Sequence, residues 1–219
     1  MTQPFGEGSV EVSDLTEDDL GAVTALHIAA FPQSELSRLG DEAVWRHYRW
    51  QLRGPHDLTA LAARTDGELV GFLLGGVFRG STAGFVKSEK WFLAGQVLRH
   101  PTLVFRGNGR RILVLAGRML ARPRRAVPEA PWRVPTHSFG VLVVAVDPTA
   151  QRLGIGASLL TTAEQRARDL GFERMHLTVR QGDVEAQAFY SRLGWRRLDV
   201  AGDDASQRLI GKELVGQRD

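Results

Sequence analysis

Apolar positions along the chain alternate between helical and strand-like spacing, which predicts a protein built from both kinds of element. Over Thr16–Phe31 apolar residues recur every three or four positions, with Thr16 suited to cap the helix and Pro32 to end it. A second helical stretch covers Glu35–Gly54, with Gly40 as a point of interruption. Later helices are expected at Glu89–Arg99, Thr102–Ala121, Gly154–Leu170 and Val184–Gly194.

Short apolar runs bounded by turn residues predict strands between these helices. Leu58–Arg64 and Glu68–Phe78 flank the dipeptide Asp66-Gly67, which is typical of a tight hairpin. The run Val141–Val146 is apolar throughout, as expected of a central strand covered on both faces. Further strands are expected at Val10–Leu15, Phe172–Arg180, Trp195–Val200 and Gln207–Leu214. The pattern therefore predicts an α/β protein, and its 219 residues fit one domain spanning 1–219.

The composition removes several classes of function. The chain has no cysteine, which excludes a disulfide scaffold, a thiolate metal site and a thiolate nucleophile. Its six histidines are scattered without metal-ligand spacing, so no metal is expected. The N-terminus lacks the basic and apolar regions of a secretory signal, and the longest apolar runs are shorter than the roughly 18 residues that span a bilayer. We expect a cytoplasmic protein.

Positive charge is concentrated in one segment, although the net charge of the chain is only +3. Between Arg99 and Arg133 there are nine arginines and a single carboxylate, Glu129. Leucine, valine and phenylalanine interrupt these arginines, so we expect residues 86–134 to form a basic, helical insertion before the fourth strand. Three roles remain open for it: a solvated cap, a lid that binds an anionic acceptor, or a peripheral contact with anionic membrane. Nucleic acid is disfavoured because no aromatic residues alternate with the arginines as stacking platforms.

A glycine-containing turn joins the central strand to the next helix. Gly154 and Gly156 occupy the point where unpaired backbone N–H groups of a helix N-terminus meet solvent. Without Cβ atoms, an anion such as a phosphate can approach these groups closely. Taken alone, a Gly-x-Gly pair is more often a packing turn, and the loop matches neither the Walker A motif nor the dinucleotide fingerprint.

Two motifs together resemble the GCN5-related N-acetyltransferase (GNAT) superfamily. The first is Gln151-Arg152-Leu153-Gly154-Ile155-Gly156 after the central strand, and the second is Ala186…Phe189-Tyr190…Gly194-Trp195 one helix and one strand later. Their separation fits the family, and close correspondence covers about Val141–Leu198. The resemblance implies a mixed, splayed central β-sheet flanked by helices, the acyl-CoA N-acyltransferase type of fold.

The resemblance also implies where a cofactor binds. Acetyl-CoA, as co-substrate, would enter the gap between strands Val141–Val146 and Arg174–Val179. Backbone groups of Ala145 and Val146 would pair with its pantetheine arm. The pyrophosphate would lie on the loop residues, which are Gln151, Arg152, Leu153, Gly154, Ile155, Gly156 and Ala157. Asp183 stands where the family often has a cofactor-contacting asparagine, and an ionised Asp accepts hydrogen bonds but donates none.

The expected reaction is transfer of an acetyl group to a primary amine by direct attack in a ternary complex. Tyr190 stands where the family often has the acid that protonates the departing thiolate, and His137 is our first candidate for the base. Ser138 and His176 are alternatives. Arg110, Arg111 and Arg118 are predicted to bind a small-molecule acceptor that carries phosphate or carboxylate, such as an amino-sugar derivative. The rival hypothesis is a non-catalytic CoA- or phosphate-binding module, or a protein that binds membrane or nucleic acid through the basic insertion.

Overall fold

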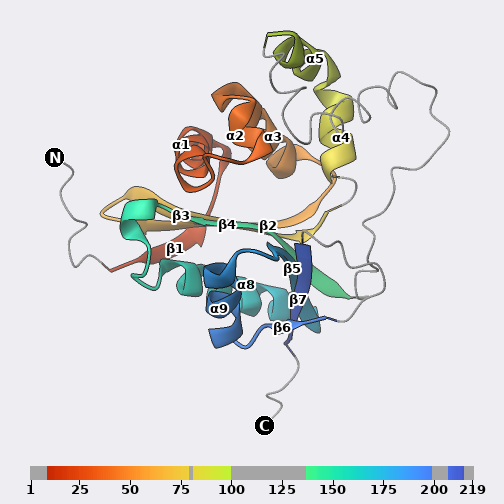
Figure 1. Ribbon diagram of the computed structural model, residues 1–219. Helices are drawn as coiled ribbons and strands as arrows, with labels where there is room; N and C mark the ends of the chain where they lie inside the picture. The colour runs from red at the N-terminus through yellow and green to blue at the C-terminus, as the bar shows by residue number, and fades with distance from the viewer. Residues whose placement is uncertain (1–8, 79–80, 100–136, 199–206, 215–219) are drawn as a thin grey trace.

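The described part of the chain forms a seven-stranded open sheet with helices on both faces (Figure 1). The computed structural model describes residues 9–78, 81–99, 137–198 and 207–214. The strands follow the order β1-β2-β3-β4-β5-β7-β6; β4 and β5 are parallel, and the other neighbouring pairs are antiparallel. Their bounds are β1 Glu11–Asp14, β2 Asp57–Thr65, β3 Glu68–Val77, β4 Ser138–Val146, β5 Arg174–Arg180, β6 Arg196–Arg197 and β7 Gln207–Glu213.

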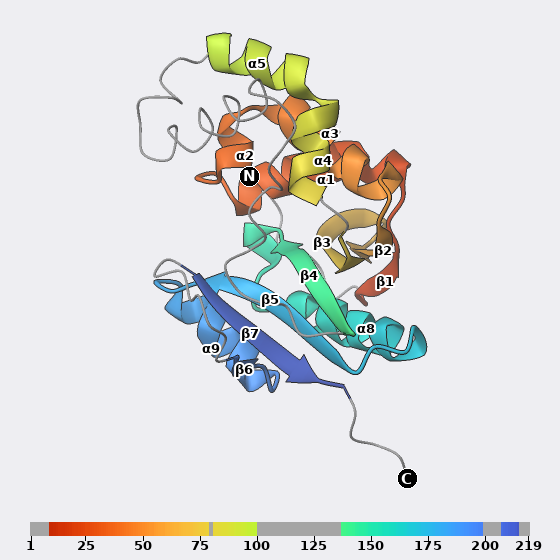
Figure 2. The same ribbon diagram turned by 90° about the vertical axis from the view of Figure 1, so that its right-hand side faces the viewer.

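The helices divide by their place in the sequence. Those that precede β4 lie on one side of the sheet, and those that follow it lie on the other (Figures 1 and 2). The first group is α1 Leu20–Ala30, α2 Glu35–Arg38, α3 Asp41–Arg53, α4 Ser81–Ser88 and α5 Lys90–Arg99, with the 3-10 turn η1 Glu17–Asp19 before α1. The second group is α8 Ile155–Asp169 and α9 Val184–Arg192, with the 3-10 turn η2 Pro148–Ala150 before α8. None of the helices in the described part of the chain is long and apolar enough to cross a membrane.

Local sequence signals account for several of the element boundaries. The Thr16 backbone N–H donates to Asp19 Oδ2 at 2.9 Å, which closes the turn that leads into α1. The predicted interruption at Gly40 is confirmed, because this residue has a φ of 92° and separates α2 from α3. Asp66 and Gly67 have φ values of 52° and 83° and form the predicted turn between β2 and β3. The helix expected at Glu89–Arg99 is α5, whereas the one expected at 102–121 lies outside the described residues.

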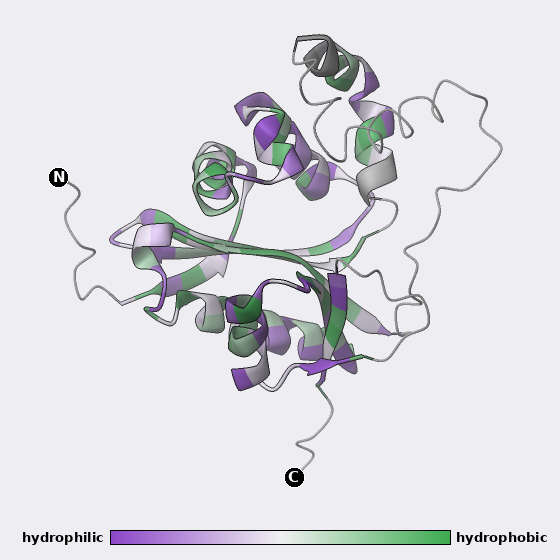
Figure 3. Ribbon diagram, in the orientation of Figure 1, coloured by the Kyte–Doolittle hydropathy of each residue, from purple (hydrophilic) through white to green (hydrophobic). Residues whose placement is uncertain are grey.

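The sheet separates two buried apolar clusters. Figure 3 shows mostly hydrophobic residues along the central strands, and a mixture of hydrophobic and hydrophilic residues along the helices on either side. The cluster on the α8 side contains the inward residues of α8, which are Ile155, Leu159, Leu160, Ala163 and Ala167, together with Met175, Leu177 and Val179 of β5. The opposite cluster joins α1 and α3 to β2 and β3. Leu170, predicted on the apolar face of α8, is 63% exposed because the helix ends one residue earlier.

A buried histidine links the N-terminal helices. His27 of α1 is only 6% exposed, and its Nδ1 lies 2.7 Å from the Tyr48 hydroxyl of α3. Its Nε2 lies 3.3 Å from Ser34 Oγ. Burial lowers the pKa of His27 from 6.5 to about 4, because the imidazolium form would lose its hydration.

This lowered pKa predicts that the protein loses stability as the pH falls from about 6.5 toward 4. In this window the unfolded chain binds a proton at His27 and the folded protein does not. We expect a slope of about 1.4 kcal/mol per pH unit from one such group at most. Urea unfolding at several pH values measures it. His27→Gln should flatten the slope, whereas Tyr48→Phe, which removes the hydrogen bond but keeps the imidazole, should preserve it. An equal slope in the His27→Gln variant would contradict this explanation.

Candidate functional site

The two central strands pair over only three residues and then separate. Ser138, Phe139 and Gly140 of β4 pair with Arg174, Met175 and His176 of β5. Beyond the Gly140–His176 pair, β4 continues against β3 to Val146, while β5 continues against β7 to Arg180. The strands therefore form a V, with its vertex at Gly140–His176 and its mouth at their C-terminal ends. This confirms the splayed sheet expected from the sequence.

The separation leaves one edge of β4 without a partner strand in the described part of the sheet. From Val141 to Val146, β4 is paired on the β3 side only. Edge groups of this kind can pair with an extended ligand as an added strand would. The edge includes Ala145 and Val146, the two residues predicted to hold the pantetheine arm.

A bulge lies just beyond the vertex. Leu74 of β3 pairs with Val143 and Gly75 pairs with Val141, so Leu142 is an extra residue in β4. The bulge changes which residues face α8. Before it Val141 packs in the α8-side cluster, and after it Val144 and Val146 do. Leu142 itself is 40% exposed at the inner end of the V.

The mouth of the V holds the N-terminus of α8. The loop from Asp147 to Gly154 turns the chain directly from the end of β4 into the helix. Asp147 Oδ1 accepts from the Thr149 backbone N–H at 2.8 Å, which fixes the start of this turn. The first intrahelical bond comes from the Ser158 N–H to Gly154 O at 3.0 Å, so the N–H groups of residues 155–157 precede the hydrogen-bonded ladder. These groups can bind an anion at the mouth.

The two glycines of the loop have different reasons to be glycine. Gly154 has a φ of 83°, which disfavours side chains, and no heavy atom lies within 4 Å of the place a Cβ would take. The space beside it is therefore open for a ligand. At Gly156 a Cβ would lie 3.3 Å from Phe189 Cζ, so this glycine lets α8 pack closely on α9.

The other loop residues lie on the surface around Gly154. Arg152 and Leu153 are exposed, and Arg152 has a φ of 66°. Gln151 Nε2 lies 3.4 Å from Val146 O and so bridges the loop back to the end of β4. Ile155 is buried against the core and anchors the first turn of α8, while Ala157 is partly buried beside it. The structure thus brings all the predicted loop residues together at the mouth of the V.

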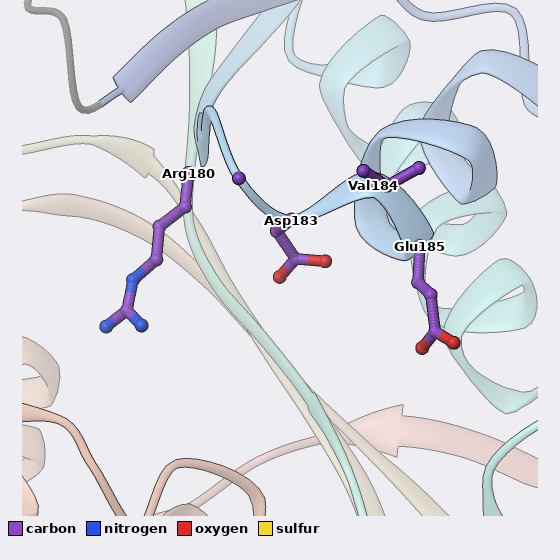
Figure 4. Close-up of a pocket in the computed structure, with 5 residues that line it drawn as sticks. Arg180, Asp183, Val184 and Glu185 are labelled. Atoms are coloured by element: carbon purple, nitrogen blue, oxygen red, sulfur yellow. The ribbon is translucent and has the colours of Figure 1, made fainter.

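An open hollow lies where β5 ends and α9 begins (Figure 4). It is lined by Arg180, Gly182, Asp183, Val184 and Glu185. Asp183 caps α9, because its Oδ1 accepts from the Ala186 backbone N–H at 2.9 Å. The structure therefore gives Asp183 a role in the helix in addition to its place in the lining of the hollow. Figure 4 shows the side chains of Arg180 and Asp183 pointing to the same side of the loop.

Tyr190 is held on α9 by aromatic neighbours. Its ring centroid lies 5.1 Å from that of Phe189 and 5.7 Å from that of Trp195. Burial, and secondarily the charge of Asp183, raise the pKa of Tyr190 to about 12. The phenol therefore keeps its proton at neutral pH and remains a hydrogen-bond donor.

The structure separates the two histidines that were candidates for the base. His137 is an exposed residue with a φ of 53°, placed before β4 at the closed end of the V. It is not brought together with Tyr190 or with the loop at the mouth. His176, one of the alternatives to His137, belongs to the last pair before the strands separate. Its signal in the sequence was its polar position between the inward residues Met175 and Leu177.

Two further predictions concern the acceptor-binding arginines and the absence of a metal. Arg110, Arg111 and Arg118 lie outside the described residues. Within the described ranges, no three His, Asp or Glu side chains gather in a way that could hold a metal ion.

Comparison with family models gives a match over most of the chain. Residues 22–195 match the model of the acetyltransferase (GNAT) family. None of the curated proteins matches this chain.

Solved structures share the fold at low sequence identity. PaiA N-acetyltransferase from Thermoplasma acidophilum, in complex with coenzyme A, has 16% identity and a TM-score of 0.57, over 94% of this chain and 99% of that one. The ribosomal-protein-S18-alanine N-acetyltransferase from Escherichia coli has 16% identity and a TM-score of 0.53, over 96% and 98%. A ribosomal-protein-alanine N-acetyltransferase from Brucella melitensis has 18% identity and a TM-score of 0.55, over 93% and 99%. At these identities the likeness establishes the fold.

The two ends of α8 offer a matched test of the loop. Gly154 and Gly171 have φ values of 83° and 81°, and neither has a heavy atom within 4 Å of a would-be Cβ. Alanine at either position should therefore cost a similar free energy of unfolding, about 1 kcal/mol. Only Gly154→Ala places a methyl group where phosphates would approach. We expect calorimetry to show acetyl-CoA affinity reduced about tenfold in Gly154→Ala and unchanged in Gly171→Ala. Equal acetyl-CoA affinities in the two variants would contradict the prediction that the pyrophosphate binds at this loop.

Proposed function

Because the chain belongs to the acetyltransferase (GNAT) family, we propose that it transfers the acetyl group of acetyl-CoA to the primary amine of an acceptor by direct attack in a ternary complex. The observation that carries this proposal is the V between β4 and β5, with the N-terminus of α8 at its mouth. This site suits a thin, extended molecule with an anionic end. The strand edge can pair with the extended part, and the N–H groups can bind the negative charge.

The cofactor would run along β4 from the mouth toward the vertex. Its pyrophosphate would meet the N–H groups of residues 152–157, and its pantetheine arm would pair with the edge at Ala145 and Val146. The acetyl thioester would then lie near the vertex, beside the bulge at Leu142. Backbone N–H groups of β4 would polarise the thioester carbonyl, which favours the tetrahedral intermediate.

The transfer needs a donor for the departing sulfur. As the C–S bond breaks, its electron pair passes to sulfur, and the thiolate takes a proton from the Tyr190 hydroxyl. The raised pKa of Tyr190, about 12, keeps this proton in place until charge develops on the sulfur. The enzyme forms no covalent intermediate in this scheme, because the amine itself attacks the carbonyl.

The acceptor would approach from the face of the sheet opposite α8 and α9. Met175, Leu177 and Val179 of β5 are buried on the α8 side, so His176, Thr178 and Arg180 alternate to the other face. We propose a small-molecule amine that carries an anionic group, bound in part by Arg110, Arg111 and Arg118. The charge of the segment that contains these arginines supports this choice of acceptor.

Turnover with a panel of amines tests the proposal directly. Thiol release from acetyl-CoA is followed with amino-sugar phosphates, small uncharged amines and peptide N-termini as acceptors. The proposal expects amine-dependent release of CoA and an N-acetylated product in the mass spectrum. Acetyl-CoA binding without turnover of any of these amines would instead favour a binding protein.

The chain contains a matched pair of tyrosines for testing the acid. Tyr190 and Tyr48 are its only two; Tyr48 is buried and Tyr190 is partly buried. Tyr190→Phe should lower kcat by about 10²- to 10³-fold with little change in the KM for acetyl-CoA. Tyr48→Phe should lower stability but retain kcat. Since Tyr190 ionises only near pH 12, its ionisation should cause no fall in kcat up to about pH 10. Full kcat in Tyr190→Phe would assign this ring to packing alone.

A further inference from the structure

One imidazole has glycine as its partner on both neighbouring strands of the sheet. His176 of β5 pairs with Gly140 of β4 and with Gly211 of β7, and Gly140 in turn pairs with Gly76 of β3. A Cβ on Gly140 would lie 3.2 Å from both Cε1 and Nε2 of His176. The ring therefore leans across β4 into space that any larger residue at position 140 would fill.

This imidazole lies at the vertex of the V. Gly140 and His176 form the last pair between β4 and β5, so the ring lies at the point where the strands begin to separate. It projects to the face opposite α8 and α9, because its sequence neighbours Met175 and Leu177 are buried on the α8 side. That is also the face from which the acceptor is proposed to come.

The two ring nitrogens have different environments. Nδ1 lies 2.7 Å from Ser138 Oγ, on the strand position two residues before Gly140. Nε2 forms no hydrogen bond with any residue that the structure describes. Ser138 is itself buried, so the bond fixes the ring while Nε2 remains available.

The surroundings keep this ring uncharged. Burial lowers the pKa of His176 to about 4, so the imidazole is neutral at pH 7 and carries a free lone pair. Among the described strands, the charged groups on the same face near this ring include Arg174 and Arg180 of β5, Glu213 of β7 and Arg196 of β6. Arg174 Nε lies 3.8 Å from Glu213 Oε2, so this carboxylate is partnered by the guanidinium.

We propose that His176 Nε2 accepts the proton of the attacking amine and that Ser138 is the positioning residue that orients the ring. The inference rests on the proposed acetyl transfer and supplies its base. The amine binds neutral, and its nitrogen becomes cationic and acidic as its lone pair forms the N–C bond. Nε2 then takes a proton from that nitrogen while the thiolate takes one from Tyr190. The imidazolium releases its proton to water and Tyr190 regains one, so the protons balance over a turnover.

The first test does not depend on knowing the acceptor. Nitrogen-15 NMR of the histidine rings reports which nitrogen carries the proton. The proposal requires Nδ1–H donating to Ser138 Oγ, with Nε2 unprotonated, from about pH 6 upward. Protonated Nε2 with bare Nδ1 in this range would overturn the assignment even if the protein acetylates amines as proposed.

The second test uses amine turnover in variants that fold. His176→Asn keeps a donor in place of Nδ1 but removes the lone pair of Nε2, and should lower kcat about 10²-fold with unchanged acetyl-CoA KM. His137→Asn is the direct comparison, because the sequence favoured that residue. An equal or larger loss in His137→Asn, or full kcat in His176→Asn, would overturn the proposal.

Chemical rescue separates a proton acceptor from a structural residue. His176→Ala opens a space beside Gly140 that free imidazole can enter. Added imidazole should raise the kcat of the His176→Ala variant at least tenfold. This rescued rate should increase with the neutral fraction of imidazole as the pH rises through about 7. Ser138→Ala should lower kcat less than His176→Asn does and should respond little to imidazole. Absence of rescue in a folded His176→Ala variant that binds acetyl-CoA normally would contradict the role of Nε2.

Discussion

The short parallel contact between β4 and β5 is the constraint on which the site depends. Three pairs, ending at Gly140 and His176, hold the two halves of the sheet together. Antiparallel neighbours then draw the strands apart, because β4 stays in register with β3 and β5 stays in register with β7. A longer contact would close the V, and a shorter one would join the halves less firmly. The number of paired residues therefore sets the position of the vertex.

Local features of β4 and of the loop that follows it shape the V. The extra residue Leu142 changes which alternate residues of β4 project toward α8, and apolar packing continues on both faces beyond the vertex. At the mouth, Gly154 combines a left-handed φ with open space, and Gly156 brings α8 against Phe189. One short stretch of chain thus brings together the unpaired edge of β4, the N-terminus of α8 and the open space beside Gly154.

Burial without a charged partner sets the chemistry of the titratable groups. Tyr190 keeps its proton and His176 stays without one, because each charged form would lose hydration in its surroundings. The two groups belong to different elements, α9 and β5, on either side of the core residues Leu177 and Val179. The proposed donor for the thiolate and the proposed acceptor for the amine proton therefore lie on separate elements.

The sequence by itself determined most of the elements and the position of the glycine-containing loop, because both depend on local patterns. Residues close together in the chain predict the turn at Asp66-Gly67 and the end of the helix before Pro32. Each of the two motifs between Gln151 and Trp195 is likewise a short local pattern. The helical period alone could not show that α8 ends before Leu170, since an apolar residue that follows a helix still fits its pattern. The tertiary structure decided which histidine stands at the vertex. His137 and Ser138 are neighbours in the sequence, yet Ser138 forms its hydrogen bond with the ring of His176, 38 positions away. That contact follows from the register of two parallel strands, and register is set by packing between distant segments, which no local pattern specifies.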